Sequence, residues 1–285
     1  MVGIGLNVAF VLVEGAFGFW ANSMALVADA GHNLSDVLGL LLAWGASYLG
    51  QQPPSPRRTY GLRRSSILAA LLNAVLLLLA IGGIAWESLQ RFVQPQAVSA
   101  LLVIAVGAVG VVINTATALL FMSGRTHDLN IRGAYLHMAA DAGVSAAVVA
   151  AGLAIRLTGW GWIDPAASLL VVVVIAIGTW GLLRESLDLA LDAVPAGINP
   201  AEVEAWLASR PGITSIHDLH IWGMSTTEVA LSAHLIKPDG RLDDAFLQQI
   251  ADELHDKFGI QHCTIQLEEA AEHSCDLMTR HAHKH

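Results

Sequence analysis

Six long apolar runs follow one another along the first two thirds of the chain, separated by short polar or Gly/Pro-bearing links. They are Gly3–Trp20, Ala25–Leu49, Ser66–Glu87, Val98–Met122, Ile131–Leu157 and Pro165–Leu183. Because an α-helix needs roughly 20 mostly apolar residues to cross a bilayer, the pattern predicts a domain of six transmembrane helices within residues 1–190. The first run has no basic leader and contains Asn7 and Glu14, which favours a retained span over a signal peptide.

The C-terminal part of the chain changes to shorter periods. Asn199 followed by Pro200 is typical of a helix start, and the apolar positions after it predict a short helix. The remaining predicted elements are the strands Ile213–Trp222 and Thr227–Lys237, a helix Leu242–Phe258 and a strand Ile260–Glu268. This αββαβ order predicts a small α+β domain, residues 195–269, with both helices on one face of its sheet. Residues 270–285 show no apolar period and are predicted to form a disordered tail.

Composition agrees with a membrane protein, because charged residues make up only 14% of the 285 residues, against about a quarter in an average soluble domain. The charge is also unevenly distributed. Residues 1–184 hold 9 arginines, no lysine and 7 acids, whereas residues 185–285 hold 6 basic and 17 acidic residues, a net charge of −11. An acidic polar part disfavours nucleic-acid binding and favours cations as partners.

The arginines in the links predict how the chain is oriented in the membrane. Links on one side carry Arg57, Arg58, Arg63, Arg64, Arg125, Arg132 and Arg184, whereas the other side carries only Arg91 and Arg156. By the positive-inside bias the richer side is cytoplasmic, so that with six spans both termini and the acidic domain are cytoplasmic. The only cysteines, Cys263 and Cys275, lie in the acidic part and favour a reducing compartment or a metal site.

Two His-x-x-x-Asp pairs lie inside predicted spans, His32 with Asp36 in the second and His137 with Asp141 in the fifth. A spacing of four places both side chains on one helical face, so two helices can offer two imidazoles and two carboxylates to one point. Four nitrogen and oxygen ligands suit Zn²⁺. The alternative is a hydrogen-bonded packing role. A carboxylate at the bilayer centre costs at least ~2.5 kcal/mol on insertion scales, however, and a bound cation would offset that cost.

Other chemistries fit these pairs less well. Haem would use the imidazoles and leave both carboxylates unexplained. Intramembrane proteolysis lacks a His-Glu-x-x-His or Gly-x-Ser-x-Gly motif.

Further polar residues within the spans are Asn7, Glu14, Asp29, Asn73 and Asn114. Each of them fits helix-to-helix hydrogen bonding at least as well as a part in ion binding. Asp29 lies one turn before His32, near the same helical face. Asp29 and Glu14 are therefore candidates for lining a gate or for supporting the ligands.

In the C-terminal domain, a hairpin centred between residues 225 and 226 would place His217 directly opposite His234. Cross-strand pairs of this kind lie about 5 Å apart at Cβ and can share a metal. On the third strand His262 and Glu268 share one face, so either could join the two histidines. Histidines are also common on sheet surfaces, and an ordinary polar surface is the alternative.

Three neighbouring residues, His220, His255 and Asp218, fit an ordinary polar surface better. His273 with Cys275 forms either a second small cluster or nothing. The terminal His281, His283 and His285 carry no weight in these predictions.

Several patterns extend over nearly the whole chain. They are Ser23-x-Ala25-Leu26-x-x-Asp29-Ala30-x-His32-x-x-x-Asp36, Thr59-Tyr60-Gly61, His137-x-x-x-Asp141, His217-Asp218-Leu219-His220-Ile221-Trp222 and Thr264-Ile265-Gln266-Leu267-Glu268. Together they resemble the cation diffusion facilitator family, and the paired His-x-x-x-Asp form resembles its zinc-transporting branch. The resemblance implies a homodimer of six-span subunits, each with a ferredoxin-like cytoplasmic domain, that exports divalent metal from the cytoplasm in exchange for protons.

The resemblance also implies roles for individual residues. It places the transport site at His32, Asp36, His137 and Asp141, and the cytoplasmic metal positions at His217, His234 and Glu268. The link Gln51–Arg64 lacks the acid or histidine that some members use for an extra metal site, so we expect none there. Gln261 stands where some relatives offer a histidine, which leaves open whether His262 substitutes. The link between the fourth and fifth predicted spans is short and carries only His127, unlike the histidine-rich loop of many eukaryotic relatives. This favours a bacterial inner (cell) membrane over an organelle.

Metal binding must displace protons, because imidazole coordinates when neutral. With a reference pKa near 6.5, His32 and His137 can exchange a proton for a metal near neutral pH. The predicted function is Zn²⁺ export by proton antiport, which is secondary transport and not enzyme catalysis. Zn²⁺ is the expected substrate and a candidate regulatory ligand, and no organic cofactor is expected.

Two rivals remain open at this point. A membrane-anchored metal sensor explains the histidines of the C-terminal domain but not the paired motifs within the spans. An importer could use the same site, because residue chemistry does not set direction. The ligands suit Zn²⁺ or Co²⁺ and, without a thiolate, disfavour Cu⁺, but they do not rank Zn²⁺ against Co²⁺, Cd²⁺, Fe²⁺ or Mn²⁺.

Overall fold

The computed structural model describes residues 2–94, 96–122, 129–238 and 244–269. The chain divides into two compact units. We call them the helical unit, Met1–Leu42 with Leu72–Leu183, and the C-terminal unit, Ala43–Leu71 with Arg184–His285. The predicted tail 270–285, the predicted helix start at Leu242 and the pair His273 and Cys275 lie outside the described residues.

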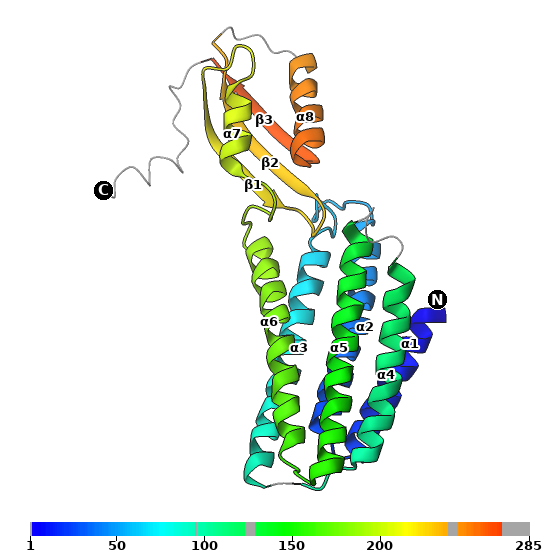
Figure 1. Ribbon diagram of the computed structural model, residues 1–285. Helices are drawn as coiled ribbons and strands as arrows, with labels where there is room; N and C mark the ends of the chain where they lie inside the picture. The colour runs from blue at the N-terminus through cyan, green and yellow to red at the C-terminus, as the bar shows by residue number, and fades with distance from the viewer. Residues whose placement is uncertain (1, 95, 123–128, 239–243, 270–285) are drawn as a thin grey trace, which may run out of the picture. The chain divides into compact units, whose positions relative to one another are not determined.

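Within the described residues, each of the six predicted apolar runs is a helix of the bundle in Figure 1. The helices are α1 (Val2–Trp20), α2 (Met24–Gly50), α3 (Ser65–Val93), α4 (Ala100–Phe121), α5 (Leu129–Thr158) and α6 (Ile163–Ala190). α3 and α6 continue past the predicted ends of their runs. A charged residue ends an apolar run but need not end a helix. Ion pairs between residues one turn apart stabilise the extra turns, with Glu87 and Arg91 at 3.2 Å in α3 and Arg184 and Asp188 at 4.0 Å in α6.

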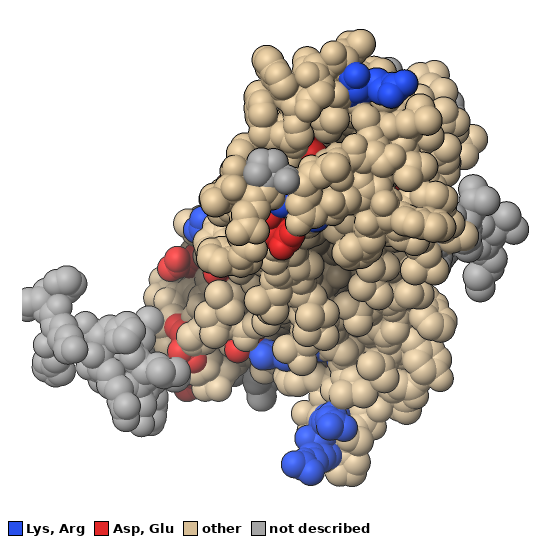
Figure 2. All heavy atoms as spheres, turned by 90° about the horizontal axis from the view of Figure 1, so that it is seen from below, with Lys and Arg blue, Asp and Glu red and all other residues tan. Residues whose placement is uncertain are grey.

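The outer surface of the helices is apolar. Leu79, Leu120 and Leu157 are 69%, 79% and 84% exposed. Figure 2 shows the molecule from below, and residues other than Lys, Arg, Asp and Glu cover most of the face turned to the viewer. Among the described residues α3, α4, α5 and α6 are long and apolar enough to cross a membrane. The part of α1 with described side chains, Ala9–Trp20, is apolar but shorter, and polar residues interrupt α2, so the count of six spans stays a prediction.

Glycines let α4 and α5 pack closely. A Cβ atom added at Gly107 would lie 2.9 Å from Val149 Cγ2, and one at Gly152 would lie 3.0 Å from Ile104 Cγ1. Small residues at helix contacts are typical of membrane bundles, where close backbone approach replaces the hydrophobic driving force.

Asp164, at the start of α6, ties that helix to the start of α2. Its buried carboxylate accepts hydrogen bonds from the Ser23 hydroxyl and from the backbone N–H groups of Met24 at 2.7 Å and Ala25 at 3.4 Å. The Ser23 hydroxyl oxygen in turn accepts from the Leu26 N–H at 3.2 Å. The first N–H groups of a helix have no partner inside it, so Asp164 fixes where α2 begins. No motif in the sequence marks Asp164 for this role.

The C-terminal domain has the predicted αββαβ order. Its described elements are α7 (Pro200–Ala208), β1 (Ser215–Gly223), β2 (Val229–Ile236), α8 (Asp244–Phe258) and β3 (His262–Glu268). The β2 strand is central, antiparallel to β1 and parallel to β3. The predicted helix start is confirmed, because Asn199 Oδ1 accepts a hydrogen bond from the Ala201 N–H at 3.1 Å.

Both helices cover one face of this sheet, as predicted. Trp206 of α7 packs against Phe258 of α8 with ring centroids 5.8 Å apart. Apolar residues of both helices share one core with Leu231, Ala233 and Leu235 of β2. Side chains alternate along a strand, so His234 lies on the opposite face, away from the helices.

β1 contains a bulge between His217 and His220. His217 pairs with His234, as the hairpin symmetry predicts, but His220 pairs with Ser232. The two β1 residues are three positions apart, whereas their partners on β2 are only two apart, so β1 contains one extra residue. Asp218 lies in this bulge and has a φ of 54°. As a result, His217 and His220 share one face of the sheet.

The link between α2 and α3 contacts the C-terminal domain within the C-terminal unit. Arg63 forms an ion pair with Glu228 of the β1–β2 hairpin, and Arg64 forms one with Asp192 after α6. Two of the four arginines of this link thus have acidic partners among the described residues.

Candidate metal sites

Helices α2 and α5 bring the two His-x-x-x-Asp pairs together. The Nε2 atom of His32 lies 3.2 Å from an Asp141 oxygen and 3.9 Å from an Asp36 oxygen. The Nε2 atom of His137 lies 3.3 Å from Asp36 and 3.7 Å from Asp141. Each imidazole therefore faces a carboxylate of its own helix and one of the other helix.

These four distances suit a tetrahedral ion. With zinc–ligand bonds of about 2.0–2.1 Å, the corners of a tetrahedron lie about 3.3 Å apart. The observed nitrogen–oxygen distances run from 3.2 to 3.9 Å. The ligand atoms of His32, Asp36 and Asp141 also lie within 4.8 Å of one another. His137 lies outside that group of three, so side chains would have to move before all four residues could surround one metal ion.

Burial leaves polar atoms of this group without partners. The Asp141 side chain is 2% exposed and that of His32 is 16% exposed. His32 Nδ1 and Asp141 Oδ2 have no hydrogen-bond partner in the described part of the chain. A buried carboxylate oxygen that accepts no hydrogen bond is costly, and a cation would supply the missing interaction. A cavity of about 330 Å³ reaches the group, and its lining includes Asn33, Asp36, Asn73, Asn114, His137 and Asp141.

Glu14 and Asp29 lie beside these four residues without joining them. Both side chains are fully buried. Glu14 Oε2 accepts a hydrogen bond from the Asn33 amide at 3.1 Å, and Asp29 Oδ2 accepts one from the Ser145 hydroxyl at 2.8 Å. Both residues thus lie close to the four, and a supporting or gating part for them stays a prediction.

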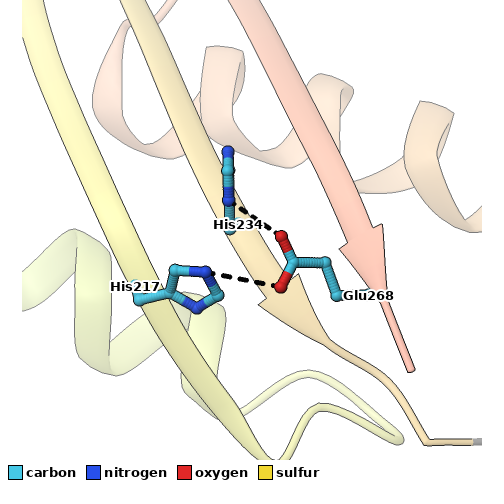
Figure 3. Close-up of side chains that lie close together, drawn as sticks. All are labelled: His217, His234 and Glu268. Atoms are coloured by element: carbon cyan, nitrogen blue, oxygen red, sulfur yellow. Dashed lines mark ion pairs between the residues drawn. The ribbon is translucent and has the colours of Figure 1, made fainter. Parts of the chain in front are cut away.

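A second group lies on the sheet face away from α7 and α8. The rings of His217 and His234 have centroids 5.0 Å apart. Figure 3 shows the Glu268 carboxylate reaching both rings, with one oxygen 2.9 Å from His234 Nδ1 and the other 3.4 Å from His217 Nε2. His217 Nε2 and Glu268 Oε2 are buried without a hydrogen-bond partner among the described residues. The three strands thus each give one residue to a group with the donor set of a metal site.

Asp218 and His220, interpreted from the sequence as ordinary polar surface, extend this group. The Asp218 carboxylate lies 3.0 Å from His220 Nε2 and 3.7 Å from His234 Nε2. Asp218 reaches this face because of the bulge, while Leu219 turns into the core. Sequence reasoning missed the contact because no turn residue marks the bulge.

The structure does not bring His262 into the group. His262 lies at the other end of β3, and its ring packs against Tyr60 with centroids 5.7 Å apart. Cys263 faces the helices, as the strand alternation predicts. Burial raises the pKa of the Cys263 thiol, which disfavours the thiolate that metal binding needs.

Comparisons with known proteins cover both parts of the chain. Residues 1–189 match the family model described as a cation efflux transmembrane domain, and residues 195–270 match that of the cation efflux protein cytoplasmic domain.

Curated relatives align over almost the whole chain. The metal cation efflux system protein CzcD of Cupriavidus metallidurans is 34% identical over 268 residues, covering 94% of this chain and 85% of the relative. The cadmium, cobalt and zinc/H(+)-K(+) antiporter of Bacillus subtilis is 35% identical over 267 residues, covering 92% and 86%. The zinc transporter ZitB of Escherichia coli is 34% identical over 289 residues, covering 99% and 92%. This chain, a membrane protein with a cation efflux domain followed by a small αββαβ domain, belongs to the cation diffusion facilitator family.

Proposed function

We propose that this protein exports Zn²⁺ from the cytoplasm in exchange for protons, with His32, Asp36, His137 and Asp141 as the ligands of the transported ion. The observation that supports this most directly is the meeting of two His-x-x-x-Asp pairs from α2 and α5, with nitrogen–oxygen distances of 3.2–3.9 Å. The names of the relatives, which include a zinc transporter and a cadmium, cobalt and zinc/H(+)-K(+) antiporter, support the cargo and the coupling to protons.

The proposed architecture is a six-span transport domain, residues 1–190, and a ferredoxin-like cytoplasmic domain, residues 195–269. The ion pairs of Arg63 and Arg64 with acids of the C-terminal unit support placing this link and that domain on one side of the membrane. By the positive-inside bias this side is the cytoplasm, with both termini there. The protein is a homodimer in a bacterial inner membrane.

Exchange of metal for protons follows from the ligands. Imidazole binds a metal only when neutral, and a carboxylate only when ionised, so protons and Zn²⁺ compete for the same four groups. Movement of the helices around a fixed site would expose it to one side of the membrane at a time. No covalent bond changes, so the protein is a transporter and not an enzyme.

The C-terminal group His217, His234 and Glu268 is proposed as a regulatory Zn²⁺ site. His217 Nε2 and Glu268 Oε2 are buried without a hydrogen bond to any described residue, which supports a cation there. Zn²⁺ held by three strands would fix the sheet face that carries them.

Zinc flux tests the proposed function. Purified full-length protein is reconstituted in vesicles that enclose a zinc-responsive dye, and a pH gradient is imposed. We expect zinc entry to rise when the lumen is more acidic than the outside, because protons leave as zinc enters. Asp36→Asn and Asp141→Asn should reduce entry to that of protein-free vesicles. The matched control Glu87→Gln, a half-exposed carboxylate paired with Arg91, should retain it.

Two results would contradict the proposal. Zinc binding without flux would indicate the membrane-anchored sensor instead. Lower zinc tolerance of zinc-sensitive cells that express the protein would indicate import.

A further inference from the structure

Two carboxyl groups outside the four proposed metal ligands lie near each other inside the helical unit. Glu14 of α1 and Asp29 of α2 are both fully buried. A Cβ atom added at Gly110 of α4 would lie 3.5 Å from Glu14 Oε1 and 3.1 Å from the hydroxyl oxygen of Ser145, which donates to Asp29, so the two carboxyls border the same small space. Each has one oxygen held by a neutral donor. The Asn33 amide donates to Glu14 at 3.1 Å, and the Ser145 hydroxyl donates to Asp29 at 2.8 Å.

The second oxygen of each group, Glu14 Oε1 and Asp29 Oδ1, has no hydrogen-bond partner in the described part of the chain. Neither carboxyl forms an ion pair with a described Lys, Arg or His side chain. Two adjacent negative charges in an apolar interior are strongly disfavoured. A single proton shared between the two free oxygens satisfies both and removes one charge.

The surroundings contain few other charges. α1 has no further titratable residue, and α4, which packs beside the pair, has none at all. A Cβ atom added at Gly110 of α4 would lie 3.5 Å from Glu14 Oε1, so this glycine leaves room for the carboxyl. The titratable groups that act on Asp29 from other positions are His32 on α2 and Asp141 on α5, both through space.

Two polar side chains connect the pair to the metal cavity. Asn33 lines the cavity and donates to Glu14. Asn114 also lines the cavity, and its amide lies 3.5 Å from the Ser145 hydroxyl that donates to Asp29. The pair therefore lies one polar side chain away from the cavity on the Glu14 side and two on the Asp29 side.

A second divalent ion fits this place poorly. Glu14 Oε2 and Asp29 Oδ2 already accept hydrogen bonds, which leaves two free oxygens and no nitrogen ligand. Zn²⁺ takes about four ligands and Mg²⁺ about six.

We propose that Glu14 and Asp29 form a proton-binding site separate from the metal ligands. The pair holds one proton when no metal is bound and releases it when Zn²⁺ binds to the His32 and Asp141 group. The reason is electrostatic. A double positive charge nearby favours the ionised pair, and its departure favours proton uptake. This coupling rests on the proposed metal–proton exchange, whereas the proton site itself does not.

Infrared spectroscopy on the purified full-length protein in lipid nanodiscs tests the site directly, because a protonated carboxyl has its own carbonyl stretching band. We expect this band in the metal-free protein and its loss in both Glu14→Gln and Asp29→Asn. Two variants are used because one of them could fail to fold, which gel filtration would reveal. Glu87→Gln is the matched control and should keep the band. A band unchanged in both pair variants would overturn the proton site.

Adding zinc to the same samples tests the coupling. We expect the band to disappear on zinc binding in the unaltered protein. In weakly buffered solution, each pair variant should release about one proton fewer per zinc, with a zinc affinity within about threefold of the unaltered protein. An unchanged proton count in both variants would overturn the coupling. If the protein shows the band but binds no zinc, the proposed function and the coupling both fail, and the proton site stands.

Discussion

His32 is the residue at which proton and metal chemistry can be separated most clearly. Replacing it by aspartate keeps four ligands but exchanges a nitrogen of reference pKa near 6.5 for an oxygen of reference pKa near 3.9. Between about pH 7.5 and 5.5 an imidazole gains its proton and loses metal, whereas a carboxylate of ordinary pKa stays ionised. His32→Asp should therefore lose up to tenfold per pH unit of the pH dependence of zinc affinity.

The same substitution should shift metal preference. A third oxygen ligand favours ions that accept more oxygen, such as Mn²⁺, over Zn²⁺. Metal titrations of the full-length protein at several pH values measure both effects. His255→Asp is the control, because His255 is exposed and paired with Asp256, and it should change neither. An unchanged pH profile together with an unchanged metal ranking in His32→Asp would remove His32 from the site.

At the scale of single elements, the start of α2 depends on a carboxylate from α6. Asp164→Ala would leave the buried N–H groups of Met24 and Ala25 and the Ser23 hydroxyl without their acceptor. Each unsatisfied buried group costs about 1–3 kcal/mol, so this variant should unfold at a clearly lower temperature. Ser23→Ala should cost less, because Asp164 still accepts from both N–H groups. Thermal unfolding in detergent gives the ranking, and equal losses in the two variants would contradict it.

The contact between α4 and α5 depends on missing side chains. Gly107→Ala would place a methyl group 2.9 Å from Val149 Cγ2 and should destabilise the protein by about 1–3 kcal/mol through overpacking. Gly178→Ala on α6 is the matched control. Nothing lies within 4 Å of a Cβ at that position, so the change should be neutral or stabilise by about 0.5–1 kcal/mol. Unfolding midpoints of the two variants decide, and a shift in the same direction would refute the packing argument.

At the scale of the whole molecule, the acidic C-terminal part predicts that zinc draws two copies together. Residues 185–285 carry a net charge of −11, so two such parts repel each other. Zinc at His217, His234 and Glu268 would lower that charge in each copy. It would also stabilise the folded domain by about 2.7 kcal/mol at a concentration one hundred times the Kd.

Energy transfer between labelled full-length protomers measures this approach. We expect zinc to raise the transfer in the unaltered protein and in His255→Ala, but not in His217→Ala. A response to zinc that is equal in His217→Ala and His255→Ala would show that zinc acts elsewhere.

The parts of this structure that the sequence predicts are those governed by regular periods. Residues four apart share one face of a helix, so helical periodicity predicts that His32 and Asp36 point in the same direction. The symmetry of a hairpin about its turn predicts that His217 pairs with His234. The structure brings the two pairs together across α2 and α5, and the four-ligand site itself stays a prediction.

The contacts that escaped prediction depend on which elements become neighbours. Nothing local to Asp164 indicates that α2 begins beside it, and nothing local to Glu14 indicates that it lies near Asp29. Packing between distant segments decides both. The register between β2 and β3 likewise cannot be predicted from local sequence. It places Glu268 beside His234 and leaves His262 at the other end of β3.

The bulge in β1 sorts its residues between water and the core. Without the extra residue, Asp218 would stand opposite Ala233 and point toward α7 and α8, in the place that Leu219 now fills. A chain lacking Leu219 could therefore keep His217 opposite His234 and still fail, because it would exchange an apolar side chain for a buried carboxylate. One inserted residue lets β1 place three polar groups on a single surface within four positions, a density that strict alternation forbids.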